Sequence, residues 1–258
     1  MTIPFYKYQG TGNDFVIIDN RNGLFPKVNH SMIAKICDRR FGIGADGLLL
    51  LESHHKVDFT MVYYNADGKL GSMCGNGGRC IVHFAKYLNI IDENTVFEAV
   101  DGLHEASINN EIVSLKMNDV DTMEVKVNSV FLNTGSPHHV EMVEDLKNYN
   151  VAEKGAFIRN NTYGKEGSNI NFVEKVETNL FAVRTYERGV EAETLSCGTG
   201  VTAVAIALSE TNRIDANNIE LHTEGGKLFV HFNKINDTYY NVYLEGPAKQ
   251  VFKGEWKW

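Results

Sequence analysis

Apolar and polar residues alternate along several short stretches of the chain. The alternation covers residues 57–64 and 111–117 in the first half, and residues 180–186 and 227–232 in the second half. Because successive side chains of a strand point to opposite faces of a sheet, this pattern predicts half-buried strands. Both halves of the chain are therefore expected to be rich in β-sheet.

Two other stretches have the spacing of a helix. Apolar side chains recur with helical spacing in residues 81–88, and residues 201–208 are apolar nearly all round, apart from Thr202. A helix without a polar face is buried. A buried helix in a strand-rich half predicts a sheet curved around that helix, which is an α+β arrangement and not a series of βαβ units.

The chain also repeats itself once. The tetrapeptides Cys-Gly-Asn-Gly (74–77) and Cys-Gly-Thr-Gly (197–200) lie 123 positions apart (197 − 74). The pairs Thr-Gly at 11 and 134, and the turns at 101 and 224, share this offset. Two homologous halves explain three such landmarks better than coincidence among common glycine pairs does. We expect two pseudo-symmetric domains, each a mixed sheet or barrel around a central helix, formed by residues 1–118 with 246–258 and by residues 119–245.

Composition and charge narrow the classes of function. The chain has 258 residues, 43% of them apolar, and a formal net charge of −8 with no run rich in lysine or arginine. Nucleic acids and anionic membranes need a basic surface, so neither is expected as a partner. No apolar run approaches the roughly 20 residues that cross a bilayer, and the first ten residues lack the apolar region of a signal peptide. We therefore expect a cytoplasmic protein.

The chain contains four cysteines, at positions 37, 74, 80 and 197, which are too few for a disulfide framework. No Cys-x-x-Cys pair and no zinc-type His-Glu spacing occurs, so no metal site is expected. Cys37 lies in an apolar-periodic stretch and Cys80 on the helix after the first loop, and both are expected to be inert core residues.

Residues 42–47 match the Gly-x-Gly-x-x-Gly dinucleotide pattern, but an apolar run follows them, so we interpret them as a turn into a strand.

The two repeated Cys-Gly-x-Gly loops suit catalysis. Glycines let the backbone turn sharply and approach a ligand, and a helix that starts there directs free N–H groups and a partial positive charge outward. Such a helix start binds a carboxylate and favours the thiolate of a cysteine beside it. Across a cleft between the domains, Cys74 and Cys197 could flank the carbon next to a bound carboxylate. One sulfur would remove a proton from one face and the other would return a proton to the opposite face, while backbone donors stabilise the enolate-like charge.

Four segments resemble the diaminopimelate epimerase family. They are Gly-Thr-Gly-Asn-Asp-Phe (10–15), Tyr-Asn-Ala-Asp-Gly (64–68), MCGNGGRC (73–80) and YERGVEAETLSCGTG (186–200). The resemblance runs from Lys7 to about Glu255. It implies an isomerase that converts LL- to meso-2,6-diaminopimelate without a cofactor, for lysine and peptidoglycan synthesis. It also implies two pseudo-symmetric domains with the active site in the interdomain cleft, and a homodimer.

The resemblance assigns roles to individual residues. It implies that Cys74 and Cys197 exchange the roles of thiolate base and thiol acid with the direction of the reaction, and that His138 and Glu187 tune them. Taken alone, His138 would be interpreted as a core or solvated histidine. A guanidinium suits a carboxylate because it can bind both oxygens. The implied substrate-binding residues are Asn13, Asn65, Gly75, Asn76, Asn169, Glu187, Arg188, Gly198 and Thr199.

Two positions depart from the family pattern. Ser136 stands where the family usually has an asparagine before Pro-His, and it reaches less far than an amide. Gly47 stands where the family often has a substrate-contacting glutamine. Both changes affect the end of the substrate away from the reacting carbon, so they bear on substrate identity more than on the type of reaction.

Two other functions remain open from the residues. A proline or hydroxyproline epimerase would use the same two thiols, but its substrate has no second carboxylate for a distal arginine to bind. A thiol-redox or binding protein would use the cysteines as a switch, through a disulfide formed on oxidation. Turnover of LL-diaminopimelate against hydroxyproline, and entry of solvent deuterium at the α-carbon, discriminate among the three.

Overall fold

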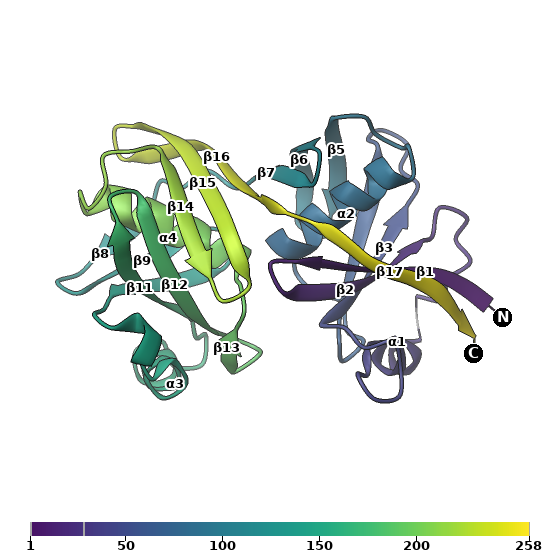
Figure 1. Cartoon of the computed structure of the whole chain (residues 1–258), viewed down its shortest axis with the longest axis horizontal. Coiled ribbons are helices and arrows are strands. Elements are labelled where there is room, and N and C mark those ends of the chain that lie inside the picture. Colours follow the sequence, from purple (N-terminus) through teal and green to yellow (C-terminus); the bar gives the residue numbers. More distant parts are fainter. Residues whose placement is uncertain (1, 28, 258) are drawn as a thin grey trace. The chain divides into compact units, whose positions relative to one another are not determined.

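The computed structural model describes residues 2–27 and 29–257. The chain divides into two compact units, residues 1–115 with 246–258 and residues 116–245 (Figure 1). The units divide between Leu115 and Lys116, whereas the repeat placed the boundary after residue 118. Among the described residues, no helix is long and apolar enough to span a membrane.

The first unit is a mixed sheet with two helices. Strands β17, β1 and β2 pair antiparallel, β2–β3 and β4–β5 pair in parallel, and β3–β4, β5–β6 and β6–β7 pair antiparallel. Its elements are β1 (Thr2–Gly10), β2 (Asn13–Asp19), α1 (His30–Cys37), β3 (Gly47–Glu52), β4 (Phe59–Asn65), α2 (Gly75–Tyr87), β5 (Asn94–Ala99), β6 (Gly102–Asn109), β7 (Ile112–Lys116) and β17 (Lys249–Lys257).

The second unit repeats this order of pairing. Strands β9–β10, β11–β12, β14–β15 and β15–β16 pair antiparallel, and β10–β11 and β12–β14 pair in parallel. Its elements are β8 (Met123–Val125), β9 (Ser129–Asn133), β10 (Pro137–Met142), the 3-10 helix η1 (Leu146–Asn148), α3 (Val151–Asn161), β11 (Asn169–Glu177), β12 (Leu180–Glu187), β13 (Ala192–Thr194), α4 (Gly198–Glu210), β14 (Asn218–Thr223), β15 (Gly226–Ile235) and β16 (Thr238–Pro247).

The central helices show the internal symmetry most clearly. Helix α2 spans residues 75–87 and α4 spans residues 198–210, so both ends of the helix are displaced by 123 positions (198 − 75 and 210 − 87). The parallel and antiparallel pairings follow the same sequence in both units. The predicted pair of pseudo-symmetric α+β halves is confirmed.

Each central helix is enclosed by strands of its own unit (Figure 1). Helix α4 contacts β9, β10, β11, β14 and β15, and its residues 200–208 are all buried. Helix α2 contacts β1, β2, β3, β4 and β6, and its residues 75–82, 84 and 85 are buried. A helix that touches strands from end to end of a sheet requires the sheet to curve around it, as the apolar pattern of residues 201–208 predicted.

Most elements expected from the sequence are present within a few residues. The four alternating stretches correspond to β4, β7, β12 and β15. Cys37 and Cys80 are buried in the core, as expected. The glycine-rich segment 42–47 leads directly into β3, so its interpretation as a turn before a strand is confirmed.

Candidate active site

Cys74 and Cys197 occupy the same backbone position at the starts of α2 and α4. Each is the residue that caps its helix, with φ/ψ of −118°/121° for Cys74 and −121°/111° for Cys197. Neither thiol makes a capping hydrogen bond to its helix, and the two carbonyls accept the first helical bonds, from Gly78 N (2.8 Å) and Val201 N (3.0 Å). Both sulfurs therefore lie beside the positive end of a helix dipole.

In the first unit, two asparagines lie next to Cys74. The Cys74 Sγ is 3.6 Å from Asn13 Oδ1, which also accepts a hydrogen bond from Asn76 Nδ2 at 3.3 Å. Asn13 Nδ2 donates to Asp46 Oδ2 at 2.7 Å. The structure thus brings three of the sequence-predicted residues together, and Gly75 joins them as the first residue of α2.

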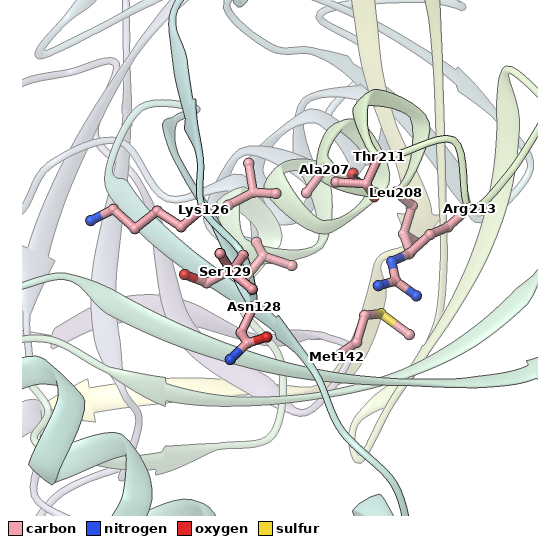
Figure 2. Close-up of a pocket in the computed structure, with 11 residues that line it drawn as sticks. Lys126, Asn128, Ser129, Met142, Ala207, Leu208, Thr211 and Arg213 are labelled. Atoms are coloured by element: carbon pink, nitrogen blue, oxygen red, sulfur yellow. Dashed lines mark hydrogen bonds between the residues drawn. The ribbon is translucent and has the colours of Figure 1, made fainter.

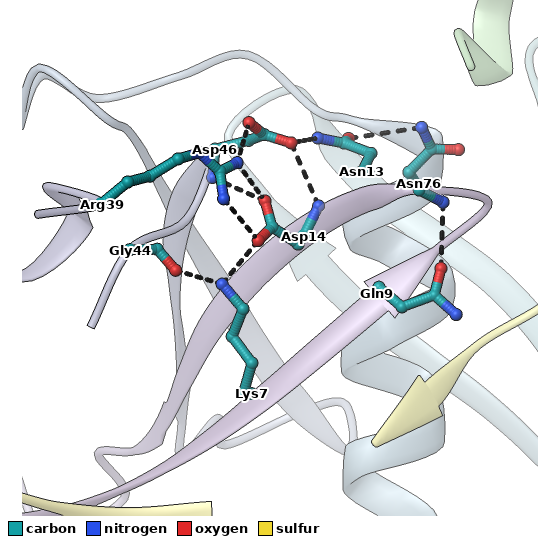
Figure 3. A network of polar contacts seen from close by, with 9 residues as sticks. Lys7, Gln9, Asn13, Asp14, Arg39, Gly44, Asp46 and Asn76 are labelled. Atoms are coloured by element: carbon teal, nitrogen blue, oxygen red, sulfur yellow. Dashed lines mark hydrogen bonds and ion pairs between the residues drawn. The ribbon is translucent and has the colours of Figure 1, made fainter. Parts of the chain in front are cut away.

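A cluster of four charged residues holds the Asn13 end of this group (Figure 3). Asp14 forms ion pairs with Lys7 Nζ at 2.6 Å and with Arg39 at 2.7 Å, and Arg39 also pairs with Asp46 at 2.7 Å. Burial of Asp14 is the largest single effect and opposes ionisation, but the hydrogen bonds from Arg39 and Lys7 and the charge of Lys7 together outweigh it and hold the pKa of the Asp14 carboxyl well below its usual range. Asp46 is held in place by its ion pair with Arg39 and by a hydrogen bond from the backbone N–H of Asp14 at 3.1 Å.

Arg79 lies inside the first unit behind the start of α2. It is fully buried and donates to Asn76 Oδ1 (2.9 Å), Thr11 Oγ1 (3.2 Å) and Gly75 O (3.3 Å). Burial lowers the pKa of Arg79 to about 10, partly offset by the thiols of Cys80 and Cys74. The guanidinium therefore remains charged at neutral pH and supports the helix start from within.

Asn65 and Gly47 lie at neighbouring positions of the same sheet. Asn65 ends β4 with its side chain exposed, and its register partner is Gly47 at the start of β3. A Cβ at Gly47 would lie 2.5 Å from the ring of Tyr63 and 2.6 Å from Tyr64 O. The Tyr63 ring thus fills the space that a longer side chain at position 47 would need, which gives a physical reason for the departure from the family's glutamine.

In the second unit, a chain of contacts leads away from Cys197. The Cys197 Sγ is 3.5 Å from Thr199 Oγ1, which is 2.9 Å from His138 Nε2. Asn169 Nδ2 lies 3.5 Å from the same ring nitrogen, and Asn169 Oδ1 accepts from the Arg188 N–H at 2.8 Å. The structure thus joins five sequence-predicted residues in one group.

The remaining predicted residues of this unit lie nearby in the chain. Glu187 ends β12 and precedes Arg188, whose guanidinium donates to Glu166 O at 2.9 Å. Gly198 is the first residue of α4, and Ser136 precedes β10, the strand that carries His138. Burial, with a smaller effect of Arg188, lowers the pKa of His138 to about 3. His138 is therefore a neutral imidazole at physiological pH.

A pocket in the second unit is separate from this group (Figure 2). Its volume is about 40 Å³, room for a few waters but not for an amino acid. Its lining residues include Lys126, Met142, Leu208 in the last turns of α4 and Thr211 directly after that helix, and none of the predicted site residues is among them. The pocket is therefore not part of the candidate active site.

Sequence reasoning missed three residues that hold the site. Arg79 lies in the family segment 73–80, outside the repeated tetrapeptide, and the sequence assigned it no role. Asp46 lies in the glycine-rich segment 42–47, which was interpreted only as a turn into a strand. Asn171 is fully buried two residues after Asn169 and contacts His138. A buried position for a polar residue in an apolar strand was the one available signal for Asn171, because buried polar groups need specific partners.

Solved structures share the fold of this chain. A PhzF-family phenazine biosynthesis protein from Bacillus anthracis superposes with a TM-score of 0.80 at 14% identity, covering 100% of both chains. A hydroxyproline epimerase from Agrobacterium vitis, with bound trans-4-hydroxy-L-proline, gives a TM-score of 0.72 at 12% identity, covering 98% of this chain and 92% of that one. The chain thus has the two-unit fold of a class that includes amino-acid epimerases.

Within this class, the sequence identifies one family. The family model for diaminopimelate epimerase matches residues 5–123 and 130–251, and the chain belongs to this family of isomerases. It is 58% identical to the diaminopimelate epimerase of Flavobacterium psychrophilum, over 97% of this chain and 99% of the relative. It is 40% identical to that of Chlorobaculum tepidum, over 95% and 98% of the two chains.

Proposed function

We propose that the protein converts LL-2,6-diaminopimelate to meso-diaminopimelate, in the synthesis of lysine and peptidoglycan precursors. The observation that carries the proposal is the equivalent position of the two cysteines. Cys74 and Cys197 have closely similar backbone conformations, each at the start of one of two equivalent helices. Family membership supports the substrate. Neither pyridoxal phosphate nor a metal takes part in the proposed reaction.

The proposed reaction needs both thiols at one substrate carbon. The α-carboxylate binds the backbone N–H groups at Gly75–Asn76 and Gly198–Thr199, where the helix starts favour an anion. One thiolate removes the α-proton and becomes a thiol, while the other thiol donates its proton to the opposite face and becomes a thiolate. The backbone donors stabilise the charge that develops on the carboxylate meanwhile.

The far end of the substrate carries a second carboxylate and an ammonium group. Arg188 is the proposed partner of that carboxylate, with Asn13, Asn65 and Asn169 as hydrogen-bonding neighbours and Glu187 as a partner of the ammonium group. A proline or hydroxyproline substrate has no second carboxylate at its far end for these groups to bind, and the likeness to the hydroxyproline epimerase, at 12% identity, concerns the fold. Diaminopimelate is therefore favoured over the cyclic substrates.

Turnover in D₂O tests the function. The reduced protein, with EDTA and without pyridoxal phosphate, is incubated with LL-diaminopimelate or with trans-4-hydroxy-L-proline. We expect meso product with one deuterium at the inverted α-carbon, and no inversion of hydroxyproline. Inversion of hydroxyproline alone would transfer the assignment to the cyclic substrates. Loss of activity on EDTA treatment, restored by a divalent metal, would contradict the metal-free mechanism.

We also propose a homodimer in the cytoplasm. Exposed apolar side chains on β17, Val251 at 57% and Phe252 at 46%, are consistent with a surface that another copy covers. A thiolate base requires a reducing compartment, because oxidation of either sulfur stops the reaction. Light scattering should give twice the 28.9 kDa chain mass; a monomer at micromolar concentration would contradict the dimer.

A further inference from the structure

Tyr63 lies on the face of the sheet that the start of α2 covers. An added Cβ at Gly77, in the first turn of the helix, would touch one side chain from each of three neighbouring strands: Met61 at 3.3 Å, and Leu49 and Phe15 at 3.6 Å. Side chains alternate between the two faces of a strand. Tyr63, two residues after Met61 on β4, therefore points to the same face as these three residues.

The ring of Tyr63 fits between two glycines. A Cβ at Gly47 would lie 2.5 Å from the ring Cε2, and a Cβ at Gly71 would lie 2.4 Å from Cδ1 and 2.5 Å from Cε1. Neither position has room for a side chain while the ring is there. Gly71 is itself tied to β4, because its N–H donates to Tyr63 O at 2.9 Å. The ring is thus held along both of its edges.

The gap at Gly47 lets the ring extend across β3. The register partners of Gly47 are Phe15 on β2 and Asn65 on β4, so β3 lies between the other two strands. Strands two apart are separated by about 10 Å, yet the rings of Phe15 and Tyr63 meet edge to face with centroids 6.0 Å apart. The Tyr63 hydroxyl consequently lies over Gly47, 3.1 Å from the place of a Cβ.

This position is at the end of the sheet that carries two proposed substrate-binding residues. Asn13 begins β2, Gly47 begins β3 and Asn65 ends β4, and the register of these strands brings the three ends together. Asn13 in turn contacts Asn76 in the first turn of α2 (Figure 3). Tyr63 remains partly exposed although Phe15 beneath it is fully buried. Its hydroxyl is therefore held on a rigid support and is open to a ligand.

We propose that the Tyr63 hydroxyl binds the substrate, through a hydrogen bond to the end of diaminopimelate away from the reacting carbon. The proposal rests on the proposed function, which supplies the substrate. A phenol both donates and accepts, so it suits either of the charged groups at that end. The residue on β4 thus provides a polar group over β3, at the position where Gly47 has no side chain to offer.

Removal of the hydroxyl alone tests the proposal. Tyr63→Phe keeps the ring, its place between the two glycines and its contact with Phe15. We expect the KM for LL-diaminopimelate to rise about tenfold, the loss typical of one hydrogen bond to a charged group. A contact far from the reacting carbon is made equally in the ground and transition states, so kcat should stay within about twofold. The urea midpoint of unfolding should not change, because the packing of the ring is kept.

The next residue of the same strand provides the matched control. Tyr64 points to the opposite face of the sheet, where it packs in the core beside Ile33 and Ile36 of α1, and its hydroxyl donates to Lys27 O at 3.3 Å. Tyr64→Phe also removes one hydroxyl from β4, but its KM should match that of the parent. An unchanged KM in Tyr63→Phe, or an equal rise in both variants, would overturn the proposal.

A crystal structure of the parent protein with bound diaminopimelate requires no variant. We expect Tyr63 Oη within about 3.2 Å of a nitrogen or oxygen at the far end of the substrate. A hydroxyl that reaches the substrate only through water, or not at all, would overturn the proposal. A parent protein that does not turn over LL-diaminopimelate would refute the proposed function. A parent that does so, with Tyr63→Phe unaffected, would refute the role of Tyr63 alone.

Discussion

Cys74→Ala should lose epimerisation by about a thousandfold but still exchange a substrate proton with solvent. A positioned acid or base accelerates proton transfer by about 10²–10⁴. Without Cys74, the second face of the substrate carbon has no proton donor, so inversion stops. Cys197 can still remove the α-proton and return a deuteron to the same face. We expect deuterium at the α-carbon with retained configuration, measured by mass spectrometry and chiral chromatography after incubation in D₂O.

Cys197→Ala should give the mirror-image result, with exchange confined to the opposite configuration. Cys37→Ala is the matched control. It also removes a buried thiol, and burial raises the pKa of Cys37 to about 12, so this residue supplies no thiolate at neutral pH. Its kcat should stay within twofold of the parent, at a cost of about 1 kcal/mol in stability. Full epimerisation by either alanine variant of the repeated pair would refute the two-base mechanism.

The sequence was sufficient for the parts of the site that the repeat duplicates. The offset of 123 located both helix starts, and the apolar pattern of residues 201–208 predicted the buried helix. The repeated tetrapeptide and the apolar pattern are each local, because each depends on residues within one or two helical turns of each other, and the offset only matches the two copies. Family motifs then supplied Asn13, Asn169 and His138, which no spacing argument would have connected to a cysteine.

The residues that orient the site could not be found in this way, because their partners are distant in the sequence. Asp46 acts through Asn13, which lies 33 positions away, and Arg79 reaches Thr11 across 68 positions. Asn171 contacts His138 across 33 positions, because β10 and β11 pair in parallel. The internal symmetry conceals them further. At the offset of 123, the counterpart of Arg79 is Thr202. The two halves therefore carry a cation and a neutral residue at equivalent positions, directly after tetrapeptides that are nearly identical.

Gly200→Ala should show how closely the second helix start is packed. A Cβ at this position would lie 2.5 Å from Asn171 Oδ1 and 3.2 Å from the Cβ of Cys197. Asn171 cannot yield, because its amide is held by His139 O and Thr185, so the start of α4 must move. We expect a loss of about 1–3 kcal/mol in the free energy of unfolding from overpacking. We expect a fall of about 10² in kcat, because a shift near 1 Å misplaces the thiol.

The pseudo-symmetry supplies the control, Gly77→Ala, at the equivalent position of α2 (200 − 123). There the nearest atom to an added Cβ is the terminal methyl of Met61, at 3.3 Å, which can turn aside. Alanine also favours a helix over glycine by up to about 1 kcal/mol, so this variant should unfold within about 0.5 kcal/mol of the parent and keep most of its kcat. Urea unfolding and steady-state assays measure both variants. Equal effects at the two positions would mean that the contact with Asn171 does not constrain the thiol, and that the helix starts are equivalent in packing as well as in backbone conformation.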